Sequence, residues 1–120
     1  AIECRINAED PENNFMPSPG KIEQLILPGG PGIRLDTHIY AGYEISPYYD
    51  SLVAKLIAYG RNRPEAIKIM RRALTEFYIA PIKTTIPFHL NLMENPLFLK
   101  GDISTHFIQE MLKVDQKGEE

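Results

Sequence analysis

The order in which two hydrophobic periodicities appear along this chain of 120 residues constrains its fold more than any other feature. Strand-like runs occupy 2–7, 22–27 and 33–40, and helical spacing covers 64–77, 87–93 and a segment that begins near Ser104. Strands followed by helices are typical of an α+β domain rather than of alternating βαβ units. We therefore expect an antiparallel sheet with about three α-helices.

The run 51–59 fits two interpretations. Its apolar residues suit either one stripe of a helix or a strand that is buried on both faces; they are Leu52, Val53, Leu56 and Ile57. Gly60 ends the run after few residues, which favours the strand.

A glycine-rich turn, PGGPG at 28–32, separates two of the expected strands. Glycine readily adopts the positive φ angles that such turns need. The turn predicts that 22–27 and 33–40 pair as a hairpin. A phosphate-binding loop is a poor alternative, because neither a Lys-Ser/Thr ending nor a helix follows the glycines.

The length of the chain is that of one domain. We expect this domain to cover 1–113 and a flexible, polar tail to cover 114–120. Ala1 leads directly into a strand pattern without an initiator methionine, so we expect the chain to be a piece of a longer protein.

Composition argues against several kinds of partner. Thirteen Lys and Arg stand against 16 Asp and Glu, a formal net charge of −3, which favours neither nucleic acid nor an anionic membrane. The single cysteine, Cys4, fits a reducing cytoplasm. The histidines His38, His89 and His106 are widely separated and belong to no zinc motif, so we expect no metal site.

A local excess of basic residues lies between Lys55 and Lys83, where seven Lys and Arg accompany two acids. A dock for an acidic partner is one interpretation. We favour a solvated helix face on which Arg72 and Glu76 pair at i,i+4.

Arg5 is the strongest single candidate for a functional residue. Successive side chains of a strand point to opposite faces, so Arg5 shares the polar face of 2–7 with Glu3 and Asn7. Its planar guanidinium could hold an oxyanion, which a lysine does less well. An ordinary ion pair with Glu3, Glu9 or Asp10 is an equally good interpretation from spacing alone.

Two tyrosines and an acid, in the segment PYYDS at 47–51, stand where a loop meets the run 51–59. They could cap the strand and anchor the core, or they could line a cleft, since tyrosine combines an apolar body with a polar tip. We favour the structural interpretation slightly.

Six segments, in order and over nearly the whole chain, resemble the C-terminal domain of biotin carboxylase. They are ECRINAEDP (3–11), FMPSPGKI (15–22), PGGPGIR (28–34), SPYYDSLVAKLIAYG (46–60), IKTTIPFH (82–89) and STHF (104–107). The combination of ECRINAEDP with PYYDS is specific, whereas each of the others would be weak alone.

The resemblance implies roles for single residues. Arg5 occupies the position of the arginine that stabilises the enolate-like oxygen of biotin in that family. Tyr49 and Asp50 fall at the biotin end of the family's site. Thr105 and His106 fall in the segment that closes beside the adenine of ATP.

The resemblance also implies a homodimer contact at the turn 28–34. Arg34 matches the family there. Pro31 departs from the bulky aromatic residue expected at its position, so the strength or geometry of this contact is open.

The family's chemistry implies cofactors and partners. An ATP-grasp module converts ATP and bicarbonate to carboxyphosphate, which carboxylates biotin on a carrier domain, and a carboxyltransferase uses the product. Mg-ATP would be bound mainly by the ATP-grasp module, upstream of Ala1, and the ATP-grasp and N-terminal domains of the same subunit would be partners of this domain. We expect the isolated chain to be inactive; the alternative is a non-catalytic interaction or dimerisation module with the same fold.

Overall fold

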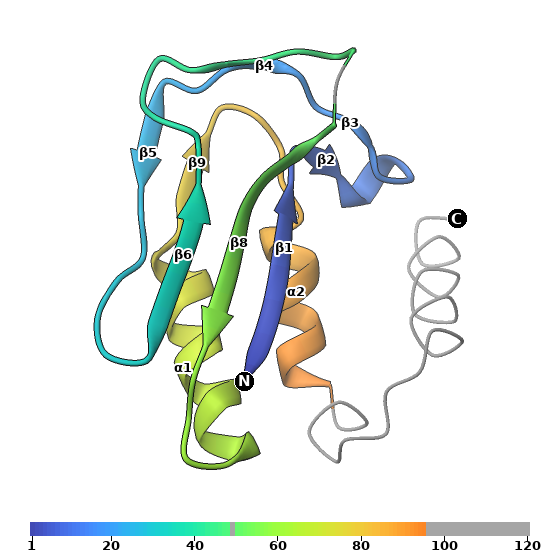
Figure 1. The fold of residues 1–120 in the computed structure, drawn as a ribbon. Coiled ribbons are helices and arrows are strands. Elements are labelled where there is room, and N and C mark those ends of the chain that lie inside the picture. The colour runs from blue at the N-terminus through green and yellow to red at the C-terminus, as the bar shows by residue number, and fades with distance from the viewer. Residues whose placement is uncertain (49, 96–120) are drawn as a thin grey trace.

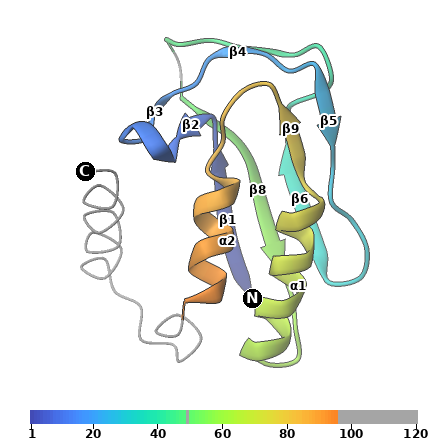
Figure 2. The same ribbon diagram turned by 180° about the vertical axis from the view of Figure 1, so that it is seen from behind.

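A computed structural model describes residues 1–48 and 50–95 as a sheet covered on one face by two helices (Figures 1 and 2). The sheet contains β1 (Ile2–Asn7), β8 (Leu52–Ala58) and β6 (Ile33–Thr37) in the order β1-β8-β6, and both pairings are antiparallel. The helices are α1 (Arg63–Glu76) and α2 (Ile86–Glu94). The expected α+β class with an antiparallel sheet is confirmed.

Shorter elements surround this sheet and extend one end of it. They are β2 (Glu9–Asp10), the 3₁₀ turn η1 (Pro11–Asn13), β3 (Met16–Pro17), β4 (Gly20–Lys21), β5 (Gln24–Ile26), β7 (Glu44–Ile45) and β9 (Tyr78–Ala80). They pair as β2 with β3, β4 with β7 and β5 with β9. The third helix expected near Ser104 and the tail 114–120 lie outside the described residues.

The run 51–59 is a strand, as its length suggested. It forms β8, the central strand of the sheet, with β1 on one side and β6 on the other. A strand with apolar residues on both faces is best placed there, because neighbouring strands and the helices then cover most of it.

The expected hairpin between 22–27 and 33–40 is wrong. β5 pairs with β9, with Leu25 opposite Ile79, while β6 pairs with β8, with Leu35 opposite Leu56. The turn 28–32 instead carries the chain from one sheet to another, helped by positive φ angles at Gly30 and Gly32. Periodicity identified both strands but not their partners, which depend on the packing of distant segments.

The hydrophobic core lies between the sheet and the helices. Its largest fully buried side chains come from both layers and from the segment between β4 and β5: Ile6, Ile22, Leu56, Met70, Leu74 and Met93. On β1 the alternation is as expected, since Cys4 and Ile6 are buried while Glu3 and Arg5 are exposed. One face of the sheet is thus packed against the helices and the other, the open face, carries charged side chains.

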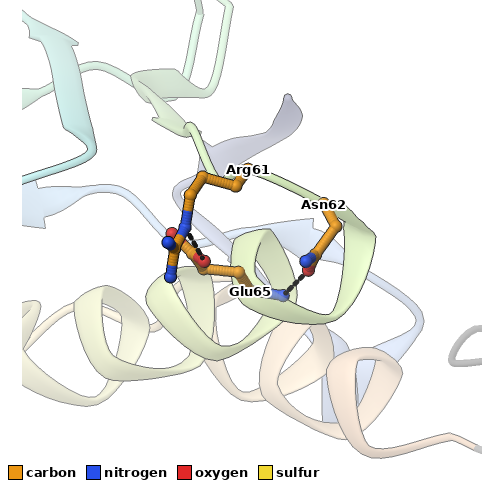
Figure 3. Close-up of polar contacts among 3 residues, drawn as sticks. All are labelled: Arg61, Asn62 and Glu65. Carbon is orange, nitrogen blue, oxygen red and sulfur yellow. Dashed lines mark hydrogen bonds and ion pairs between the residues drawn. The ribbon is translucent and has the colours of Figure 1, made fainter.

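Helix α1 begins with a side-chain cap (Figure 3). The Asn62 side chain accepts a hydrogen bond from the backbone N–H of Glu65 at 2.9 Å, and Arg61 pairs with the Glu65 carboxylate at 2.9 Å. A cap of this kind stabilises a protein by about 1 kcal/mol. The ion pair is exposed and contributes less.

The side chain of Arg72 does not pair with Glu76 in the described part of the chain, contrary to expectation. It donates to the backbone carbonyls of Gly29 and Pro31, at 3.5 and 3.3 Å. A long guanidinium on a helix can reach a neighbouring loop, and these two carbonyls lie outside the strands. Arg72 therefore ties the turn 28–32 to α1.

Candidate functional site

Arg5 lies in the middle of β1, with its side chain on the open face of the sheet. In the antiparallel register it stands directly opposite Lys55 of β8, and Lys55 stands opposite Asp36 of β6. Directly opposed residues of antiparallel strands point to the same face, with Cβ atoms roughly 5 Å apart. The three side chains therefore form one row across the open face.

Two of the acids that could have paired with Arg5 are engaged elsewhere. The Glu9 carboxylate accepts hydrogen bonds from the Asn7 amide at 3.3 Å and from the Ser51 hydroxyl at 2.9 Å. The Asp10 carboxylate accepts from the backbone N–H of Glu12 at 3.0 Å and from the Asn13 side chain at 2.8 Å. Both acids fix the loop that follows β1.

The guanidinium of Arg5 is consequently open to a ligand. Among residues 1–48 and 50–95, the ion pairs are Arg34–Asp36, Arg61–Glu65 and Arg71–Glu94, and none includes Arg5. Its neighbour on the same face, Glu3, is not among them either. The ion-pair interpretation of Arg5 thus has no support in the described part of the chain.

The backbone at Arg5 is held by the start of α2. The carbonyl of Arg5 accepts hydrogen bonds from His89 Nε2 at 2.8 Å and from the Thr85 hydroxyl at 3.4 Å. Thr85 also exchanges two bonds of 3.0 Å with the backbone of Asn7. Within the described ranges β1 has a strand neighbour on one side only. These bonds therefore pair part of its other edge and fix the position from which the Arg5 side chain extends.

His89 must be neutral to make this contact without a buried charge. A carbonyl can only accept, so Nε2 carries the proton and Nδ1 is left with its lone pair. Nδ1 is buried without a hydrogen-bond partner among the described residues. Burial lowers the pKa of His89 below its ordinary value of 6.5, and the hydrogen bond to Arg5 opposes this shift only in part.

Lowering the pH is therefore expected to destabilise the fold through His89. Below about pH 6.5 the unfolded chain binds a proton that the folded chain does not, so the free energy of unfolding falls until the pH reaches the lowered pKa, and then levels off. His89→Gln keeps a donor for the Arg5 carbonyl but cannot titrate. Urea denaturation at pH 7.5 and 5.5 should show a smaller loss for this variant than for the native chain; an equal loss would contradict the role of His89.

Cys4 has no catalytic character. It is buried in the core, and burial raises the pKa of its thiol to about 12, with Glu3 contributing in the same direction. The thiolate, which is the nucleophilic form, is therefore not populated near neutral pH.

Asp50 lies two residues before β8 rather than beside Arg5. Its carboxylate accepts a hydrogen bond from the backbone N–H of Leu52 at 3.0 Å, and the next residue, Ser51, bonds through its carbonyl to the N–H of Ala8. Asp50 is five residues from Lys55, the partner of Arg5, which is on the order of 15 Å along a strand. Tyr49, Thr105 and His106 lie outside the described residues.

The two residues expected at a dimer contact are exposed. Pro31 lies in the turn 28–32, where its carbonyl accepts from Arg72, and Arg34 pairs with Asp36 on the open face at 3.3 Å. Neither contacts Arg5 in the described structure. Arg5 on β1 and Arg34 on β6 therefore lie at opposite edges of the three-stranded sheet, with β8 between them.

A groove of about 740 Å³ lies away from Arg5. It is formed by η1, β9 and the first turns of α2, and its walls include Phe77, Ile82 and Phe88. A smaller hollow of about 270 Å³ lies between β6 and β8 and is lined in part by Asp36, His38 and Lys55. No three His, Cys, Asp or Glu side chains among residues 1–48 and 50–95 are grouped to hold a metal ion.

Sequence reasoning missed three residues of this site. Thr85 and His89 are about 80 residues from Arg5 in the chain, and Lys55 is 50 residues away. Only the resemblance of the segment IKTTIPFH to the family marked the first two. No local pattern could reveal Lys55, because its place opposite Arg5 depends on strand register.

No helix in the described part of the chain is long and apolar enough to cross a membrane.

Comparison with known proteins agrees with the motifs. A family model described as the biotin carboxylase C-terminal domain matches residues 3–110. The chain is 58% identical over 113 residues to the biotin carboxylase of Nostoc sp., covering 94% of this chain and 25% of that protein. It is also 58% identical over 109 residues to biotin carboxylase 1 of Bacillus subtilis, covering 91% and 24% respectively.

A solved structure shows the same fold. The biotin carboxylase domain dimer of Hydrogenobacter thermophilus 2-oxoglutarate carboxylase, in complex with MgADP, ADP and bicarbonate, has a TM-score of 0.90 and 47% sequence identity. The match covers 94% of this chain and 25% of that one. The chain thus spans about a quarter of the length of these relatives.

Proposed function

This chain belongs to the biotin carboxylase C-terminal domain family, and from that premise we propose that it supplies one wall of a biotin carboxylation site. In the full-length protein, the site carboxylates carrier-bound biotin with ATP and bicarbonate, by way of carboxyphosphate. The single observation that carries the proposal is the guanidinium of Arg5, which is exposed, without an acid partner in the described structure, and extended from a strand with a fixed backbone.

The chemistry needs a cation at this place. When bound, biotin supplies a ureido nitrogen that accepts the carboxyl group, while negative charge develops on the ureido oxygen. A donor that is already oriented towards that charge lowers the barrier without reorganising during the reaction. Arg5 can supply this cation, and the bonds from Thr85 and His89 to its backbone carbonyl fix the position from which its side chain extends.

The other expected site residues have lesser roles in the proposal. Asp50 and Tyr49 belong to the biotin end of the site, and Thr105 and His106 lie beside the nucleotide. Mg-ATP is held mainly by the ATP-grasp module, and the ATP-grasp and N-terminal domains of the same subunit are partners of this domain. The carrier domain and a carboxyltransferase are the remaining partners.

A homodimer is part of the same proposal. Residues 29–31 of the turn and Arg34 are exposed on the side of the molecule away from β1, and the related Hydrogenobacter domain is described as a dimer. A non-catalytic dimerisation module is the alternative function, and it would need this surface but not the open guanidinium of Arg5.

The test is an assay of the full-length protein for biotin carboxylation. We expect phosphate release from ATP that depends on both bicarbonate and biotin, and we expect none from the chain of 120 residues alone. A full-length protein that dimerises but never carboxylates biotin would favour the non-catalytic module.

A further inference from the structure

The open face of the sheet brings a second cation to Arg5. We propose that Lys55 and Arg5 together bind a small oxyanion, a carboxylate or phosphoryl group, so that Lys55 is a further binding residue of the site. The inference rests on the proposed function for the identity of this anion, which is bicarbonate or the phosphate derived from ATP.

The register of β1 against β8 places Arg5 next to Lys55. Arg5 and Lys55 are direct Cα partners in the β1–β8 ladder, so both side chains extend from the open face with Cβ atoms roughly 5 Å apart. At that spacing one oxyanion can lie between a guanidinium and an ammonium group. Both strands belong to the packed sheet, which keeps the pair in place.

Neighbouring acids offset the charge of this pair only in part. Asp36, the partner of Lys55 on β6, is engaged by Arg34 at 3.3 Å, and no ion pair in the described ranges includes Lys55. Glu3 lies on the same face but pairs in register with Ile57. The three strands therefore present three cations and two carboxylates, in a chain whose net charge is −3.

Two like charges directly opposite each other destabilise a sheet. An anion bound between Arg5 and Lys55 would remove the repulsion. The hollow of about 270 Å³ between β6 and β8 is a separate place, because it is lined by Asp36 as well as Lys55 and by no residue of β1. The direct opposition of two cations on an exposed face therefore points to a binding role.

The test compares Lys55→Met with Lys55→Arg and with Lys68→Met in the full-length protein. Lys68 is a matched control, because it is an exposed lysine on α1, which covers the other face of the sheet (Figure 2). At constant ionic strength, Lys55→Met should lower kcat/KM for bicarbonate, or raise the inhibition constant of inorganic phosphate, by about tenfold, as for the loss of one charged hydrogen bond. A change in kcat/KM for bicarbonate would identify the anion as bicarbonate, and a change in the inhibition constant would identify it as phosphate. Lys55→Arg should restore most of the loss.

Two outcomes would overturn the inference. If the native protein carboxylates biotin and Lys55→Met matches Lys68→Met in both arms, Lys55 does not bind the anion, although the proposed function stands. If the native protein does not carboxylate biotin, the proposed function is wrong, but the inference about Lys55 can still be tested by binding. Equilibrium dialysis with radiolabelled phosphate then decides on Lys55, since equal affinity of the native protein and Lys55→Met would exclude its role.

Discussion

Replacing Arg5 by alanine is expected to lower kcat/KM for biotin carboxylation by roughly 10²–10³-fold in the full-length protein, about 3–4 kcal/mol of transition-state stabilisation. The reason is that a cation is lost from the place where negative charge develops. The fold should survive, because the Arg5 side chain is exposed and its backbone carbonyl still accepts from His89 and Thr85. Steady-state kinetics with free biotin measure the effect.

Two controls separate catalysis from folding. Arg61→Ala removes an exposed arginine that precedes α1 and pairs with Glu65, and it should leave kcat/KM unchanged. Arg5→Lys keeps the charge but loses the planar fork, so an intermediate rate is expected. Native turnover in Arg5→Ala, with unchanged thermal unfolding, would rule out the proposed role of Arg5.

Local elements followed from the sequence because their causes are local. The alternation in 2–7 depends only on the period of a strand, and the structure buries Cys4 and Ile6 while it exposes Arg5. Helix α1 begins within one residue of the expected position, because Asn62 caps it through its own side chain.

Pairing could not be predicted, since it depends on segments far apart in the chain. The turn 28–32 has the composition of a hairpin, yet β5 lies beside β9 and β6 lies beside β8. The Arg72 side chain likewise bonds to a loop about 40 residues away instead of to Glu76, one helical turn away. In both cases tertiary packing overrode a good local signal.

The site shows the same division. The choice of Arg5 came from its residue type and strand face, and its role from the family resemblance. That Arg5 forms no ion pair with Glu9 or Asp10 in the described structure could not be predicted from the sequence. Both acids have the right charge and spacing, yet their carboxylates bond within the loop that follows β1. The opposition of Lys55 to Arg5 required the strand register.

Gly60→Ala is expected to cause the largest loss of stability among these changes, about 3 kcal/mol, at the upper end of ordinary overpacking. Gly60 links β8 to α1, and an added Cβ would meet the backbone of the first turn of that helix. It would lie 2.9 Å from Ala66 Cα and closer still to Ala66 N. Backbone atoms cannot rotate away as a side chain can, so α1 or β8 must shift. Urea denaturation measures the change.

Gly29→Ala is the matched control. A Cβ at Gly29 would meet nothing within 4 Å, and Gly29 does not have the positive φ of Gly30 and Gly32. Its substitution should therefore change the free energy of unfolding by less than about 0.5 kcal/mol, as for most surface positions. Equal losses at Gly60 and Gly29 would show that chain flexibility, rather than the close approach of β8 to α1, determines the effect. A loss at Gly60 alone would show that the β8–α1 junction tolerates no added side-chain atom, and it is this junction that holds the strand bearing Lys55 against the helix layer.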